Sequence, residues 1–246
     1  MKYLLLAAIS LSSTLSYAQS KKFSFKLGSE YGLPKKSEDL SFFGNEKDGI
    51  VNLSLKKDEL SITRFDPKSL VQTAEKTIEL SELTNNYNSE AVIDFDNNYF
   101  WVHSDWDKNE EKELLYYDKI DVVSGKITST NNKMIETTKM GGELVRSGGG
   151  WPALKMGFKY QFNFSADRKR LLVSYKLFPK ERNDKKNYDK IGVHVFDDKM
   201  NKLWSAEYDM PYTEAIMDNI DFSIDSYGNA YLLAKVYDSE KLVPRS

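Results

Sequence analysis

Short runs of apolar and aromatic residues, separated by turn residues, dominate the chain beyond its N-terminal segment. Phe, Tyr, Val, Ile and Leu fill these runs, and Asn, Gly, Asp and Ser-Gly pairs interrupt them, which is typical of β-strands and their turns. A helical period of hydrophobic positions is hard to find. The pattern therefore predicts an almost wholly antiparallel β-protein.

One hairpin recurs three times, always as a strand, an Asp, a short turn and a second strand. The strands that begin these hairpins are 60–66, 115–121 and 192–197. Asp66, Asp121 and Asp197 open the three turns, where an Asp side chain accepts hydrogen bonds from the backbone N–H groups that follow it. Because each hairpin repeats the Asp, we interpret these carboxylates as turn-forming residues and not as a binding site.

A second hairpin precedes each of these and forms the inner strand pair of the same unit. The inner pairs are 40–43 with 50–55, 91–95 with 99–103, 160–164 with 171–177, and 220–224 with 230–236. The last pair has no outer hairpin after it. Tandem four-stranded antiparallel units predict an all-β fold, a β-propeller with about three and a half blades present. A β-sandwich, which also strings short strands together, is the alternative.

The first 18 residues have the features of a secretory signal peptide: Lys2, an apolar run at 4–9, and small residues Ser16 and Ala18. The apolar run is shorter than the ~20 residues that a membrane-spanning helix needs. We therefore expect cleavage after Ala18, a periplasmic or extracellular location, and no transmembrane segment.

The remaining chain is expected to form one domain. We assign residues 19–241 to a propeller domain that is incomplete at its C-terminus, so that apolar sheet faces are exposed at its ends. Residues 242–246 resemble a protease-site scar.

Composition narrows the class of protein further. Hydrophobic residues make up 40% and aromatic residues 13% of the 246 positions, which is enough for a packed core. The formal charge of -2 and a pI near 5.9 argue against nucleic acid or anionic lipid as the main partner. The chain has no Cys, so no disulfide supports the fold.

Two stretches carry the strongest resemblance to known proteins, 224–232 (IDSYGNAYL) and 195–204 (VFDDKMNKLW). Together with the turn-Asp hairpins, they make residues 22–238 resemble exported bacterial β-propeller proteins. The resemblance implies a fold and an exported location, and it carries no catalytic residue across.

In a propeller blade, the loops after the second strand and the crossovers to the next blade open on one face of the ring, which we call the loop face. The other turns, including the Asp turns, open on the opposite face, the turn face. The predicted loops of the loop face are 81–90, 105–113, 139–159, 178–190 and 207–219. Since long loops are where binding usually occurs, we expect a ligand on the loop face.

The predicted ligand-binding residues are the side chains of the loop face that combine contact area with directional polar groups. They are His103, Asp105, Trp106, Asp107, Arg146, Trp151, Tyr212 and Glu214. Trp151 follows three Gly residues, a pattern that fits either a ligand contact or a flexible crossover whose Trp packs in the core.

Two functions remain open from the residues alone. The favoured one is a binding or scaffold module that recognises a protein or glycan of the cell envelope. The alternative is a carbohydrate-active enzyme with loop carboxylates near Trp106 and Trp151. Its candidate carboxylates are Asp105, Asp107, Glu143, Glu214 and Asp218.

No metal site or cofactor is predicted. Residues 105–111 place oxygen ligands at alternate positions, as in half of a calcium loop, but Glu110 replaces the Gly and Tyr116 the final acid. A solvated hairpin fits this stretch better. His103 and His194 fall in predicted strands without a second His or Cys at ligand spacing. The sequence has no nucleophile elbow, phosphate loop or dinucleotide fingerprint.

Overall fold

The structure is a computed structural model that describes residues 27–80, 87–138, 140–141, 143–146, 154–157, 159–178 and 187–238. Of these, residues 143–146 and 154–157 are described by their backbone alone. Every regular element in the described ranges is a β-strand. No helix within those ranges is long and apolar enough to cross a membrane. The expected signal peptide, the predicted loop segment 81–86 and the C-terminal scar lie outside the described residues.

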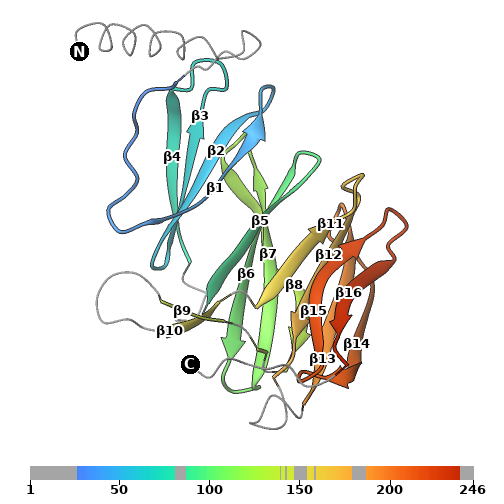
Figure 1. The fold of residues 1–246 in the computed structure, drawn as a ribbon. Helices are drawn as coiled ribbons and strands as arrows, with labels where there is room; N and C mark the ends of the chain where they lie inside the picture. Colours follow the sequence, from blue (N-terminus) through green and yellow to red (C-terminus); the bar gives the residue numbers. More distant parts are fainter. Residues whose placement is uncertain are drawn as a thin grey trace, which may run out of the picture.

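Three four-stranded sheets and two two-stranded sheets are found in the described part of the chain (Figure 1). Blade 1 contains β1 (Glu38–Asn45), β2 (Gly49–Lys56), β3 (Glu59–Phe65) and β4 (Gln72–Glu79). Blade 2 contains β5 (Asn88–Phe95), β6 (Asn98–Asp107), β7 (Lys112–Asp121) and β8 (Lys126–Thr137). Blade 3 contains β11 (Tyr160–Phe164), β12 (Arg170–Lys176), β13 (Tyr188–Asp197) and β14 (Lys202–Thr213). The half-blade contains β15 (Met217–Ile224) and β16 (Ala230–Val236). A small hairpin of β9 (Glu143–Arg146) and β10 (Leu154–Gly157) lies in the crossover between blades 2 and 3.

The strand order establishes the propeller architecture and excludes the sandwich alternative. Within each blade every strand pairs antiparallel with the next strand in the sequence. A sandwich would instead distribute the strands over two facing sheets. The described sheets do not close into a ring, in agreement with about three and a half blades. The predicted all-β fold and the predicted inner and outer hairpins are therefore confirmed.

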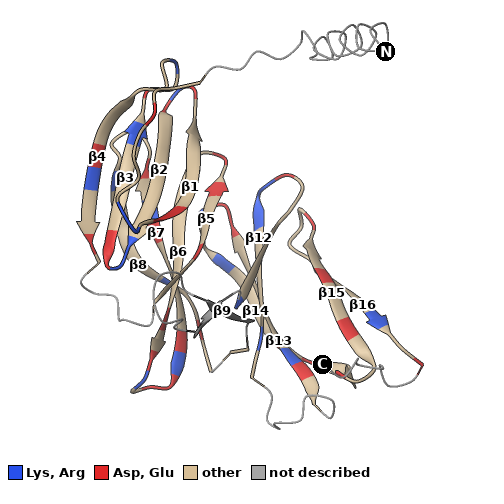
Figure 2. Ribbon diagram, turned by 60° about the vertical axis from the view of Figure 1, so that its left-hand side comes forward, with Lys and Arg blue, Asp and Glu red and all other residues tan. Residues whose placement is uncertain are grey.

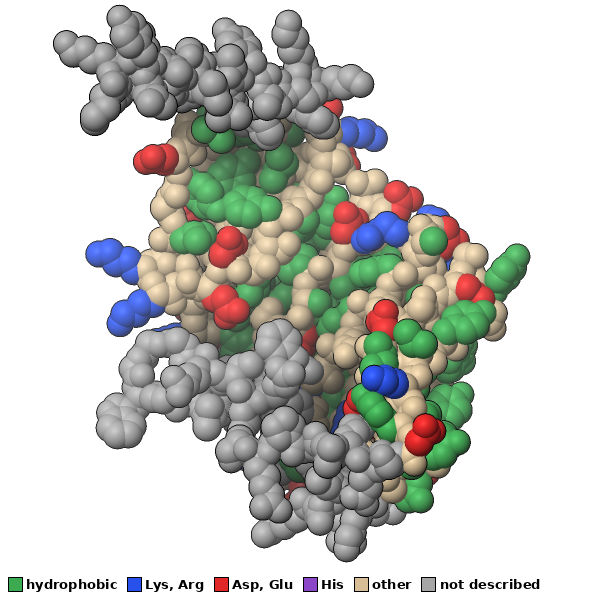
Figure 3. Space-filling view, in the orientation of Figure 1, with side chains coloured by type: hydrophobic (Ala, Val, Ile, Leu, Met, Phe, Trp, Pro, Cys, Tyr) green, Lys and Arg blue, Asp and Glu red, His purple; other side chains and the backbone are tan. Residues whose placement is uncertain are grey.

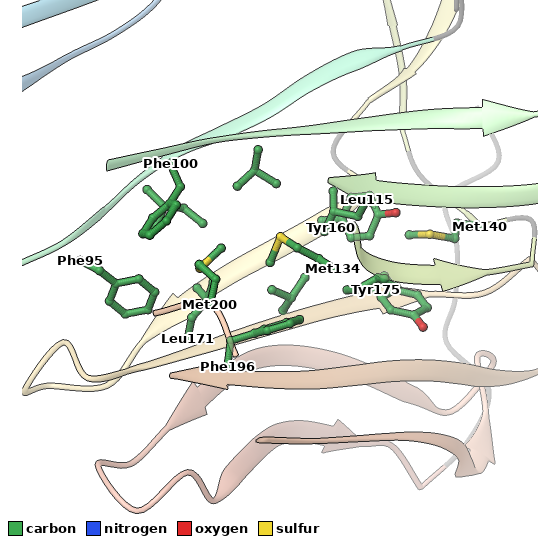
Figure 4. Packing of buried hydrophobic residues seen from close by; sticks show 14 of the residues in the cluster. Phe95, Phe100, Leu115, Met134, Met140, Tyr160, Leu171, Tyr175, Phe196 and Met200 are labelled. Carbon is green, nitrogen blue, oxygen red and sulfur yellow. The ribbon is translucent and has the colours of Figure 1, made fainter. Parts of the chain in front are cut away.

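Blade 2 is buried on both faces because blade 1 covers one face and blade 3 covers the other. Successive side chains of its strands point alternately to these two faces. In β6, Tyr99 and Trp101 join the core between blades 1 and 2. The alternate residues Phe100 and Val102 join the core between blades 2 and 3. Figure 4 shows this second core, with Phe95 at one end and Met140 at the other. The uninterrupted apolar run in β6 is thus explained by burial on two sides.

The Asp turns are built as the sequence predicts. The Oδ1 atom of Asp121 accepts hydrogen bonds from the N–H groups of Val123 and Ser124 at 2.8 and 3.1 Å. Asp197 accepts the N–H groups of Lys199 and Asn201 at 2.9 and 2.8 Å. Lys68 and Ser69 donate to Asp66 at 3.1 and 2.7 Å in the same way. These carboxylates stabilise turns on the turn face.

The inner strands β1, β5 and β15, but not β11, share a feature that the sequence pattern does not show. The pairing register shifts between Asp39 and Ser41 in β1, between Ser89 and Ala91 in β5, and between Asn219 and Asp221 in β15. Each shift is a β-bulge, which re-aims a side chain locally. The bulges insert Leu40, Glu90 and Ile220.

Two of the predicted loops are mostly strand. β6 continues to Asp107 and β7 begins at Lys112, so a turn at 108–111 replaces the expected loop 105–113. β14 continues to Thr213 and β15 begins at Met217, so the expected loop 207–219 is a short crossover. The prediction of two long loops was wrong because it took polar residues as a sign of loop. Polar residues can also occupy the arms of strands wherever the strands project beyond the core.

Candidate functional site

A buried group of charged side chains lies where the seam between blades 2 and 3 reaches the loop face. The ammonium group of Lys159 contacts the carboxylate of Glu113, and its Nζ atom lies 3.9 Å from Oε1 of Glu90. These side chains are only 5 to 6% exposed. Ser104 completes the group, since its Oγ donates a 2.5 Å hydrogen bond to Glu90 Oε1. Two carboxylates therefore share one ammonium group inside the protein.

Four elements position this cluster, hereafter the Lys159 cluster. The β5 bulge carries Glu90, the loop-face end of β6 carries Ser104, and the start of β7 carries Glu113. Lys159 directly precedes β11 and so belongs to the next blade. The ion pair thereby ties the start of blade 3 to blade 2.

Burial dominates the electrostatics of the Lys159 cluster. Loss of solvent raises the pKa of Glu113 above its usual value, although the charge of Lys159 acts in the opposite direction. Burial also raises the pKa of Tyr160 well above its usual value, and the charges of Glu113 and Glu90 add to this effect. Among the described residues, no group hydrogen-bonds the Tyr160 hydroxyl. The cluster is a desolvated structural contact between blades and has no carboxylate open to solvent.

A second ionic group, the Lys176 cluster, lies at the next seam. Lys176 contacts Glu214, and its Nζ lies 2.7 Å from Oδ1 of Asp189. Asn219 donates a 2.9 Å hydrogen bond to the other carboxylate oxygen of Asp189. The residues come from β12, β13, the crossover and β15, so this group connects blade 3 to the half-blade.

His103 lies inside the fold. Its side chain is 0% exposed, and its ring packs between Trp101 and Tyr116 with centroid distances of 4.6 and 5.7 Å. Nε2 lies 3.4 Å from Oδ1 of Asp118. A ligand on the loop face would therefore meet the end of β6 before it reached this imidazole.

The acidic stretch that begins with Asp105 has structural contacts. Asp105 is 8% exposed, and its charge is one of the causes that raise the pKa of Glu113. Asp107 accepts hydrogen bonds from the N–H groups of Asn109 and Glu110 at 2.8 and 3.1 Å, so it caps the turn. In the part of the chain that the structure describes, no group of three or more His, Asp or Glu side chains is placed to hold a metal ion.

The remaining predicted residues divide between two seams. Trp106 is half-buried at the end of β6 in blade 2. Tyr212 is 44% exposed near the end of β14, and Glu214 belongs to the Lys176 cluster. For Arg146 only the backbone, in β9, is described, and Trp151 lies outside the described residues. The described residues lie toward the loop-face ends of their strands but on different blades, and His103 is buried. Ligand binding by these residues remains a prediction.

Sequence reasoning missed Glu90, Glu113, Lys159, Lys176 and Asp189. Glu113 and Lys159 are 46 positions apart and belong to different strands. No local spacing marks such a pair, because blade packing alone brings the two residues together. One sequence feature could have indicated the Lys159 cluster: Lys159 is a lysine placed directly before an inner strand.

Solved structures with a similar fold share little sequence with this chain. The Dos1 propeller aligns over 77% of this chain with a TM-score of 0.41 and 8% identity, and this chain spans 40% of its length. An endo-arabinase from Bacteroides thetaiotaomicron aligns over 81% with a TM-score of 0.38 and 12% identity, covering 70% of that enzyme. An acylaminoacyl peptidase from Pyrococcus horikoshii aligns over 83% with a TM-score of 0.37 and 11% identity, covering 31% of that protein. No family model and no curated protein matches the sequence. The propeller assignment therefore rests on the strand pairing.

Proposed function

We propose that this chain is an exported binding module that recognises a protein or glycan of the cell envelope through its loop face. The proposal of export is supported by the signal-peptide features of residues 1–18. The proposal of binding is supported by the aromatic side chains that the loop face presents.

The observation that carries the proposal is the position of Trp106 and Tyr212 at the ends of ordered strands. Trp106 is half-buried at the end of β6, and Tyr212 is 44% exposed in β14. Side chains on strand ends lose less conformational freedom on binding than side chains on long loops. Aromatic rings offer large apolar contact area together with a polar edge, which suits both sugars and protein surfaces.

The described carboxylates of the enzyme alternative are engaged in structural contacts. Asp107 caps a turn, Glu214 pairs with Lys176, and Asp218 accepts a 2.8 Å hydrogen bond from the Tyr237 hydroxyl. An acid and a nucleophile of a glycosidase would instead have to face a common sugar. These contacts favour the binding interpretation.

A retention assay with immobilised protein tests the proposal. The protein is incubated with two defined envelope fractions, purified peptidoglycan and a detergent extract of envelope proteins, and the retained material is measured. Trp106→Ala and Tyr212→Ala should each reduce the retained material several-fold while the melting temperature changes little. Asp121→Ala and Asp197→Ala on the turn face are the matched controls. They should lower stability but leave retention unchanged. Equal retention by all four variants would contradict binding through the loop face.

A further inference from the structure

The Lys159 cluster joins blade 2 to blade 3, and we propose that it works as a proton-operated latch. The cluster holds one carboxyl proton while the seam between the blades is closed, and loss of this proton to solvent water loosens the seam beneath Trp106. The latch makes the loop face responsive to pH. It acts whatever ligand the loop face binds, so it goes beyond the proposed function.

The seam between blades 1 and 2 shows that this fold packs the same place with apolar side chains. Three positions correspond in the two seams: the bulge of the inner strand, the residue of the second strand beside it, and the residue before the next inner strand. In the seam between blades 1 and 2 they are Leu40, Leu55 and Tyr87, which join one hydrophobic cluster. In the seam between blades 2 and 3 they are Glu90, Ser104 and Lys159. Polar groups, two of them ionisable, thus replace apolar ones at this place.

Burial makes this replacement costly. The charged side chains that Figure 3 shows project from the molecular surface, whereas Lys159, Glu113 and Glu90 are only 5 to 6% exposed. A buried ion pair is often less stabilising than well-packed apolar side chains of similar volume. Stability alone therefore does not account for the Lys159 cluster, and its groups are ones that exchange protons.

Ser104 indicates where a proton is held. Its hydroxyl donates a 2.5 Å hydrogen bond to Oε1 of Glu90, and it is also a hydrogen-bond partner of Glu113. A hydroxyl has one proton, so when it donates to one carboxylate it can only accept from the second carboxyl group, which must then carry a proton. Glu113 in its protonated form satisfies Ser104 and still offers its carbonyl oxygen to the ammonium group of Lys159.

The surroundings of Glu113 favour the protonated form. Burial raises the pKa of Glu113 above its usual 4.5, and the charge of Asp105 adds to this effect, although Lys159 acts in the opposite direction. The acidic residues of β6, Asp105 and Asp107, both lie at its loop-face end, in the charged region at the lower end of blade 2 in Figure 2. From pH 4.5 up to the raised pKa, the closed seam therefore binds a proton that an open, hydrated seam releases. Closure weakens as the pH rises through this window.

The other groups that face this place keep their charge state in the window. Burial raises the pKa of Tyr160 on β11 and of Tyr175 on β12, so both hydroxyls stay protonated. His194 on β13 contacts Tyr175, and burial lowers its pKa to about 4, which leaves the imidazole neutral. On β8, Thr137 lies opposite Glu113 and has no titratable group. Among the described residues, a proton exchanged in this window belongs to the carboxyl groups of the cluster.

Trp106 connects the latch to the loop face. It lies opposite Glu113 in the pairing of β6 with β7, so the two side chains share one face of blade 2. Leu115, two residues further along β7, belongs to the core between blades 2 and 3, so this face is directed toward blade 3. An ionised Glu113 needs hydration. Water that enters the seam to reach it changes the surroundings of the Trp106 ring.

A pH titration of the full chain measures the proton directly. The side-chain carboxyl carbons of isotope-labelled glutamate are followed by NMR from about pH 4 to 9, a range that begins near the usual pKa of glutamate. We expect one glutamate signal to titrate at a higher pH than the rest. This signal should be missing from Glu113→Gln.

Chemical labelling of amines measures the opening of the seam. Lys159 is buried, whereas the side chain of Lys56 in blade 1 is 42% exposed and serves as the internal reference. The rate at which acetic anhydride modifies Lys159, relative to Lys56, should rise by up to about tenfold per pH unit within the window, because opening releases one proton. In Glu113→Gln, whose neutral side chain imitates the protonated form, the ratio should stay constant.

Glu136→Gln is the matched control. Glu136 also binds two lysines, with Oε1 2.7 Å from Lys112 and Oε2 2.6 Å from Lys133, but it lies at the surface of blade 2. Hydrogen bonds from these lysines lower its pKa to about 2, so it is ionised throughout the window. Glu136→Gln should therefore leave both the high-pH signal and the labelling ratio as in the wild type.

Trp106→Ala separates the latch from the proposed function. It should reduce ligand retention but keep the high-pH glutamate signal, so either proposal can fail without the other. Titration of every glutamate in the usual range, or a high-pH signal that persists in Glu113→Gln, would overturn the latch. A labelling ratio of the wild type that stays constant with pH would also overturn it, and this measurement needs no variant. Melting curves identify any variant that fails to fold.

Discussion

Lys159 and Glu113, which are 46 residues apart in the sequence, form an ion pair inside the seam between blades 2 and 3. The pair joins the first residue before blade 3 to the start of the third strand of blade 2. Desolvation of two charges is costly, and the mutual attraction offsets that cost only while both partners are present. Substitution of either residue should therefore weaken the packing of blade 3 against blade 2.

Lys159→Met should destabilise the fold strongly. The methionine keeps most of the side-chain volume but leaves Glu113 and Glu90 without their shared cation, at a cost of about 3–5 kcal/mol. Urea denaturation followed by tryptophan fluorescence measures the loss. Adding Glu113→Gln to this variant should restore part of the stability, because one buried charge is removed.

Lys133→Met is the matched control for this prediction. Lys133 pairs with Glu136 at 2.6 Å, but its side chain is 52% exposed, so solvent screens the interaction. Lys133→Met should therefore reduce the unfolding free energy far less than Lys159→Met does. Equal losses would show that the buried pair contributes no more than a surface pair.

His194 should make stability depend on pH. Burial lowers its pKa from the usual 6.5 to about 4, and the charge of Lys202 acts in the same direction. Between these two values the unfolded chain binds a proton that the folded chain does not. Stability therefore increases as the pH rises from about 4 to 6.5 and is lost as the pH falls through this window, by an amount on the order of 3 kcal/mol.

His194→Gln isolates this contribution. Glutamine retains a polar group near the hydroxyl of Tyr175, which lies 3.0 Å from Nε2 of His194. The unfolding free energies of the two proteins should converge as the pH is lowered, because only the wild type loses the contribution of His194. The carboxylates titrate equally in both proteins and do not affect the difference. A wild-type curve parallel to that of the variant between pH 4.5 and 7 would rule out the predicted linkage.

Gly192 should not tolerate a side chain. A Cβ atom at this position would overlap the ring of Tyr175 on the neighbouring strand. Gly192→Ala should therefore lower the unfolding free energy by about 1–3 kcal/mol, as overpacking of a core does. In a Tyr175→Ala background the same change should cost much less, and thermal denaturation of the four proteins measures this coupling. Gly32→Ala, which has no heavy atom within 4 Å of its added Cβ, serves as the neutral control.

The exposed outer face of the half-blade agrees with the expectation of apolar faces at the ends of the domain. Ile220, Tyr231 and Leu233 are 54, 55 and 62% exposed. The alternation of β16 indicated this arrangement, because Leu232 packs on blade 3 and its two neighbours must then point outward. Because these apolar side chains are exposed, we expect the chain to associate or to bind a hydrophobic dye through this face.

The sequence by itself determined the strands, their grouping into blades and the Asp turns. These features depend on residues only a few positions apart: the alternation of side chains along a strand, and the bonds from Asp121 to the N–H groups of Val123 and Ser124. It also indicated which end of each blade carries the crossovers, since that follows from the order of the strands.

The tertiary structure alone decided where charges are buried and how far the strands extend. The Lys159 cluster assembles residues from two blades, and the β5 bulge that carries Glu90 has no signature in the local pattern. The end of β6 at Asp107 and the depth of His103 depend on which neighbouring blade covers each face. Burial is a property of the packed blades, and residues that are distant along the chain determine it.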